Sequence, residues 1–151
     1  MTANEKRQRR RVATLAAAVA VLMAASAARA QEAGVIARDG WVRRPAPSKK
    51  EAAMFVVVEN HTAQKRKIVA VTTDASSVAE MHEMQMTKTS MVMTPISELS
   101  IPAHGKTTLN PDRYHIMLFG LKSRPEIGDV INAKLKLDDG TIVSFAATVR
   151  K

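Results

Sequence analysis

Hydrophobic and polar residues alternate along the last part of the chain. In residues 130–137 (VINAKLKL) one set of alternate positions holds Ile, Ala, Leu and Leu, and the other includes Asn and two Lys. A period of two predicts a half-buried β-strand, because successive side chains of a strand point to opposite faces. Asp139-Gly140 follows as a strong hairpin signal, and residues 141–149 supply the returning strand.

Earlier stretches of the chain have the same short, strand-like character. β-Branched, aromatic and other hydrophobic residues fill them, and Gly, Pro, Asn or Asp separate them. We predict strands at residues 41–43, 51–60, 65–74, 80–86 and 91–96, around 101, and at 107–109 and 114–119, with a flexible lead over 31–37 and a loop over 74–77. No segment after residue 30 shows a sustained helical stripe. Many short strands with frequent turns indicate an antiparallel β-sandwich.

The first thirty residues follow a different pattern. A cluster of Lys and Arg in residues 6–11 precedes an Ala- and Val-rich run over 12–28, and Ala28-Arg29-Ala30 places small residues where a signal peptidase reads them. This order predicts a cleaved secretory signal peptide over residues 1–30, exported by the general secretory route rather than the twin-arginine one. An uncleaved membrane anchor is the alternative. The predicted mature part, residues 31–151, is a single domain.

The net charge of the whole chain is +9, but more than half of it lies in the predicted signal peptide. Residues 1–30 carry six Lys and Arg against one Glu, so five positive charges leave with the signal peptide and four remain. The predicted mature part has little net charge and few aromatic residues, so nucleic-acid binding loses its main support.

The chain contains no cysteine, which excludes thiolate metal sites and dithiol redox chemistry.

Methionine and histidine gather in one part of the chain. Six of the nine methionines and three of the four histidines lie within residues 81–117. Residues i and i+2 of a strand share a face, so His115 and Met117 should point together while Tyr114, Ile116 and Leu118 point into the core. The other groups predicted to share a face are His82, Met84 and Met86 in one strand and Met91 with Met93 in the next.

Imidazole and thioether together form an uncharged, soft set of metal ligands. Such ligands suit Cu(I), whereas Zn(II) more often recruits thiolates, several histidines or a carboxylate, and Ca²⁺ or Mg²⁺ needs oxygen. A blue-copper electron-transfer site would need a cysteine. A single His-x-Met is more often packing than ligation, and Met81, Met84, Met86 and Met91 can each be core filler.

The spacing of the wider constellation is more specific. Ten residues separate His82 from Met93, twenty-one separate Met93 from His115, and Met117 stands two positions further on. This His-x10-Met-x21-His-x-Met spacing resembles that of the periplasmic copper chaperones called the PCu(A)C family. The segments DGWVRRPAP, EMHEM, YHIMLFGLK and IGDVINAKLKLDDGTIVSFAATV also resemble the family, so the resemblance covers nearly all of residues 39–149.

The resemblance implies a fold, a site and a role. The fold is expected to be a cupredoxin-like Greek-key β-sandwich. Cu(I) is expected on an exposed face, bound by His82, Met93, His115 and Met117. The role is that of a non-enzymatic, monomeric chaperone in the periplasm. It docks transiently with a copper acceptor, expected to be cytochrome c oxidase or its assembly factors, and passes the ion by ligand exchange. On this assignment Met84 and Met86 are surface neighbours of the site, and His61 and His104 are loop residues.

Two other functions remain as alternatives. A copper-dependent redox protein on the same fold would need a cysteine or a third histidine near the metal, and the motif has neither. A structural, storage or adhesion-type sandwich would use the methionines as packing.

Two further sequence features are explained by structure rather than by function. Asp138-Asp139 before Gly140 is predicted to be a turn rather than a catalytic pair, and residues 65–67 (KRK) a solvated strand end rather than a nucleic-acid patch.

Overall fold

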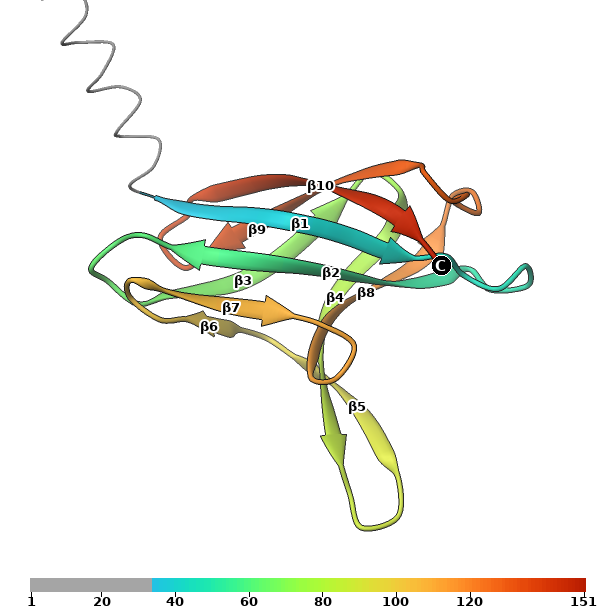
Figure 1. The fold of residues 1–151 in the computed structure, drawn as a ribbon, viewed down its shortest axis with the longest axis horizontal. Coiled ribbons are helices and arrows are strands. Elements are labelled where there is room, and N and C mark those ends of the chain that lie inside the picture. Colours follow the sequence, from blue (N-terminus) through green and yellow to red (C-terminus); the bar gives the residue numbers. More distant parts are fainter. Residues whose placement is uncertain (1–33) are drawn as a thin grey trace, which may run out of the picture. The chain divides into compact units, whose positions relative to one another are not determined.

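The computed structural model describes residues 34–151, and the predicted signal peptide lies outside them. These residues form strands and no helix, so they contain none long and apolar enough to cross a membrane (Figure 1). The strands are β1 (Val35–Arg43), β2 (Glu51–Asn60), β3 (Arg66–Thr73), β4 (Ser76–Met86), β5 (Met91–Ile96), β6 (Leu99–Ile101), β7 (Gly105–Leu109), β8 (Tyr114–Leu121), β9 (Val130–Leu137) and β10 (Ile142–Arg150). The predicted all-β class is confirmed.

The strands are joined by hydrogen bonds into one curled sheet. Its order is β5-β4-β8-β2-β1-β10-β9-β3-β6, and β7 pairs with β2. The pair β1–β10 is parallel, and the other described pairs are antiparallel. Strand β3, near one end of this order, packs beside β4, near the other end. The sheet therefore closes around a shared interior.

The core lies between the inward faces of the curled sheet. Strand β9 buries every second residue, as its alternating sequence predicts. On β8, Ile116 and Leu118 are fully buried. The main inward residues of β2 and β9 are Ala52, Met54, Val56, Val58, Ile131, Ala133, Leu135 and Leu137. Burying one large apolar side chain contributes about 1.5–3 kcal/mol, so this layer fixes the strands that carry the site.

Two predicted boundaries were wrong. Residues 35–37, predicted to belong to a flexible lead, instead open β1, which begins at Val35 and pairs with β2 from Asn60 onward, while residues 31–33 of that lead lie outside the described residues. The register shifts between Arg38 and Trp41, and Asp39 there has a φ of 56°. This bulge interrupts the period of two, which hid the strand in the sequence. The loop predicted over 74–77 also ends early, because β4 begins at Ser76.

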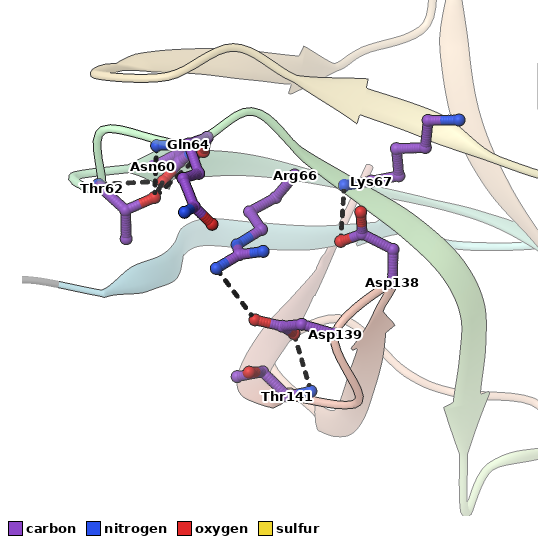
Figure 2. A network of polar contacts seen from close by, with 8 residues as sticks. All are labelled: Asn60, Thr62, Gln64, Arg66, Lys67, Asp138, Asp139 and Thr141. Carbon is purple, nitrogen blue, oxygen red and sulfur yellow. Dashed lines mark hydrogen bonds and ion pairs between the residues drawn. The ribbon is translucent and has the colours of Figure 1, made fainter.

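Acidic residues of the β9–β10 turn bind the basic start of β3 (Figure 2). Arg66 forms an ion pair with Asp139 at 3.3 Å, and the backbone N–H of Lys67 donates to Asp138 at 3.1 Å. The backbone N–H of Thr141 donates to Asp139 at 2.9 Å, and this bond lowers the pKa of the Asp139 carboxyl. The predicted turn and the predicted strand end are both confirmed.

Candidate metal centre

Strand β4 and its two neighbours carry the candidate site. It pairs with β8 on one side and with β5 on the other. The outer end of the β4–β5 hairpin projects from the rest of the sandwich (Figure 1). Its polar tip is closed by Thr87, whose N–H and hydroxyl both donate to the Ser90 carbonyl, at 2.7 and 2.8 Å. The break predicted between the two strands is confirmed.

His82 and His115 stand directly opposite each other on β4 and β8. Their ring centroids are 5.8 Å apart. Both are buried, with 9% of His82 and 4% of His115 exposed. The opposition follows from the register of two strands that are held by the core residues on their other face. The two imidazoles are therefore more recessed than the exposed site implied by the family resemblance.

Aromatic rings enclose the two imidazoles. Trp41 packs on Phe55 with centroids 4.3 Å apart, and Phe55 lies 6.4 Å from His115. On the other side Phe119 lies 5.9 Å from His82. A continuous row of rings thus crosses β1, β2, β8 and β4. It shields both imidazoles from water, and burial disfavours the charged form of His115.

The histidine rings have nitrogen atoms available for a ligand. The Nδ1 atoms of His82 and His115 are buried and have no hydrogen-bond partner. Nε2 of His82 lies 3.1 Å from a carboxylate oxygen of Glu80. An ionised carboxylate only accepts hydrogen bonds, so in a neutral His82 this contact places the proton on Nε2 and leaves a free lone pair on Nδ1. Burial lowers the pKa of His115, and repulsion from a protonated His82 lowers it further.

Met117 lies beside the histidine pair. It stands on β8 between His115 and Phe119, on the face that these two share. Both of those rings lie within 6 Å of the His82 ring, at 5.8 and 5.9 Å. Met117 therefore emerges between two rings that both approach His82, and it is partly buried. Its cross-strand partner is Glu80.

Met93 shares this face but stands further out. It lies on β5 opposite Met84, two cross-strand pairs beyond His82, which is opposite Pro95. The His82 ring lies near Glu80 and Phe119, so it leans away from the part of the hairpin that carries Met93. Met93 is 53% exposed. The structure thus brings His82, His115 and Met117 together and places Met93 at the open edge.

Glu80 and Phe119 are parts of the site that the sequence reasoning missed. Both could have been found by extending the period of two, from His82 to Glu80 on β4 and from Met117 to Phe119 on β8.

The methionines of the β4–β5 hairpin fall into two groups by their exposure. Met81 is core, 5% exposed, whereas Met86 and Met91 are exposed at 80% and 54%. The assignment of His82, Met93, His115 and Met117 as metal ligands stays a prediction.

The fold and sequence also match known proteins. Residues 35–149 match the family described as "Putative lipoprotein LpqE-like". The chain belongs to the LpqE-like family. A relative, the putative lipoprotein Lxx21020 of Leifsonia xyli subsp. xyli, is 32% identical over 121 residues, which are 80% of this chain and 72% of the relative.

Solved PCuAC domains have the same fold. The apo PCuAC domain from PmoF1 is 22% identical, with a TM-score of 0.65, over 77% of this chain and 92% of that domain. Cu(I)-bound DR1885 from Deinococcus radiodurans is 31% identical, with a TM-score of 0.59, over 78% of this chain and 76% of that protein. The cupredoxin-like β-sandwich expected from the sequence is confirmed, and with it the resemblance to PCuAC domains at the level of fold.

Proposed function

We propose that this protein is a periplasmic copper chaperone. It binds Cu(I) through His82, His115 and Met117, with Met93 as the outer fourth ligand. It is not an enzyme, since the ion is its cargo and leaves unchanged. The acceptor is a copper protein under assembly, for which the family resemblance indicates cytochrome c oxidase. Export through the signal peptide of residues 1–30 brings the mature chain to the periplasm.

The facing pair of buried imidazoles carries this proposal. A buried nitrogen without a partner costs free energy, about 1–3 kcal/mol for each unsatisfied polar atom. His82 and His115 each have such a nitrogen. A bound metal ion would satisfy both Nδ1 atoms, and the adjacent Met117 thioether makes the set soft and uncharged. That set fits Cu(I) better than Zn(II), which prefers thiolate, more histidines or a carboxylate.

The known relatives support the same cargo. The structure of DR1885 was solved with Cu(I), and that protein is 31% identical to this chain. A PCuAC domain from PmoF2 was solved with copper bound, but at 16% identity it supports the fold alone. The lipoprotein descriptions of the LpqE-like family and of the Leifsonia relative agree with a place in the cell envelope.

Delivery would proceed by ligand exchange. Neutral imidazoles and thioethers hold Cu(I) without a thiolate, so no single bond locks the ion in place. Met93 is exposed on the hairpin, and an incoming ligand from an acceptor reaches this side first. Glu80 holds Nε2 of His82 throughout, which keeps the Nδ1 lone pair directed to the ion. No proton needs to move, because both imidazoles bind in their neutral forms.

A chelator competition tests the proposal. The purified protein should take one Cu(I) with high affinity from a colorimetric chelator under reducing conditions, and the double variant His82→Ala/His115→Ala should lose this high-affinity binding. His61→Ala with His104→Ala is the matched control, because both residues lie in loops and are exposed, and it should bind as the wild type does. Wild-type affinity in the His82/His115 variant would refute the site. Transfer to candidate apo acceptors, beginning with the soluble copper domain of the oxidase, then tests delivery.

A further inference from the structure

The outer half of the β4–β5 hairpin carries methionines in cross-strand pairs. Met84 stands opposite Met93, and Met86 stands opposite Met91. Directly opposed residues of an antiparallel pair project to the same side, and so do residues i and i+2 of one strand. The four thioethers therefore lie on one face of the hairpin, in two successive pairs.

These methionines are not packed as core residues. Met86 is 80% exposed and Met91 is 54% exposed, whereas Met81, on the other face of β4, is buried. Hydrophobic side chains stabilise a fold in proportion to the area that they remove from water, at about 25 cal/mol per Å². Met86 and Met91 leave much of their area in water. Burial therefore does not explain why methionine occupies these positions.

The cation nearest to Met84 on the β8 side, Arg113, is turned away from this face. Met84 donates its N–H to the carbonyl of Arg113, the residue just before β8, at 2.6 Å. The Arg113 guanidinium lies over the Tyr114 ring at 4.6 Å and 3.6 Å from Glu83. Tyr114 and Glu83 oppose each other on the opposite face of the strands. The hairpin thus separates its charged groups near β8 from its thioethers.

From this arrangement we infer a second soft-metal site, formed by Met84, Met86 and Met91, with Met93, the cross-strand partner of Met84, at the border with the first site. Thioethers select Cu(I), whereas Ca²⁺ and Mg²⁺ require oxygen ligands. Successive pairs on one face are about 7 Å apart, and methionine has three rotatable side-chain bonds. Sulfur atoms from both pairs can therefore converge on one ion.

The second site deepens the proposed function and rests on it for the identity of the cargo. An ion on Met84, Met86 and Met91 lies next to Met93, which borders the first site. It passes inward when metal–sulfur bonds break and metal–nitrogen bonds to His82 and His115 form. The oxidation state does not change, and neutral imidazoles release no proton. The exposed methionines thus serve as the entry point for copper.

Silver titration of the metal-free protein tests the inference, because Ag(I) is a soft monovalent ion without redox chemistry. Native mass spectrometry should show two Ag(I) ions on the wild-type monomer. The methyl NMR signals of Met86 and Met91 should shift with one of the two equivalents. Met86→Leu with Met91→Leu should bind one ion. Leucine conserves volume and hydrophobicity, so an apolar docking surface would tolerate this change while a thioether site would not.

Two further variants separate the sites. Val92→Leu is the matched control, because Val92 pairs with Gln85 on the opposite face of the hairpin, and it should keep two ions. The double variant His82→Ala/His115→Ala should still bind one ion, held by the methionines of the second site.

Each outcome decides between the two proposals. One ion on the wild type, with the Met86 and Met91 signals unmoved, would overturn the second site and leave the proposed function standing. A second ion seen only in dimers, or two ions on the double leucine variant, would also overturn it. Binding confined to Met86 and Met91 would support the second site and remove the histidine site of the proposed function.

Discussion

His82 on β4 and His115 on β8 are directly opposed cross-strand neighbours, with ring centroids 5.8 Å apart. Each ring is fixed by a strand whose other face is packed in the core, so the pair is pre-organised before any metal arrives. Pre-organised ligands do not have to be ordered on binding, which strengthens affinity.

His115→Ala should weaken Cu(I) binding strongly. Changing a residue that only orients a metal ligand costs about 10- to 100-fold in affinity, and we expect the loss of His115 itself to cost more. His115→Gln, which fills more of the space, should be equally impaired if the imidazole nitrogen is what matters. Chelator competition measures both, and circular dichroism checks that both variants are folded. Retention of affinity in either variant would remove His115 from the site.

Glu80→Ala should reduce Cu(I) affinity by about 10- to 100-fold by releasing the His82 ring. Glu80→Gln should largely restore it, because the amide oxygen still accepts a hydrogen bond from Nε2. Nitrogen NMR of the His82 ring supplies a readout that loss of stability would not move. The wild type and Glu80→Gln should show the proton on Nε2, and Glu80→Ala should show a mixture. An unchanged tautomer in Glu80→Ala would contradict this positioning role.

The sequence predicted the faces of the strands well and the depth of the site poorly. His115 and Met117 point away from Ile116 and Leu118, as the period of two requires, because the strand backbone itself sets that alternation. The contact of Glu80 with His82 depends on side-chain rotamers, which a sequence pattern does not specify. The row of rings through Trp41 and Phe55 depends on pairings between distant strands, and local periodicity does not specify these pairings.

Acid should destabilise the metal-free protein partly through His115. Burial lowers the folded-state pKa of His115 below its ordinary value of 6.5, so the unfolded chain binds this proton more readily. The contribution of His115 to the free energy of unfolding is therefore full above pH 6.5 and is lost as the pH falls toward the folded-state pKa. Urea unfolding at pH 7.5 and 5.5 should show a larger drop for the wild type than for His115→Gln. Equal drops would contradict this linkage.

Gly40→Ala should destabilise the fold at the β1 bulge. A Cβ at this position would lie 2.5 Å from the Ala146 carbonyl oxygen of β10, which is backbone and has little room to move. We expect a loss of about 1–3 kcal/mol, as for other overpacked sites. Gly34→Ala is the control, since its Cβ meets nothing within 4 Å. Urea denaturation of both variants measures the difference, and equal midpoints would show that β1 and β10 separate easily.

Met93 and Met117 should differ in how they hold the ion. Met93 is exposed at the hairpin edge, whereas Met117 emerges between His115 and Phe119. Met93→Leu should weaken Cu(I) binding by about tenfold, or 1.4 kcal/mol, mostly through faster release. Met117→Leu should weaken it more, because Met117 is partly buried on the face that carries both imidazoles. Stopped-flow transfer to excess chelator measures the release rates, with Met54→Leu in the core as the control. If Met93→Leu releases copper at the wild-type rate, then Met93 is not a ligand of the histidine site. The hairpin would then bind metal only through the outer methionines of the second site.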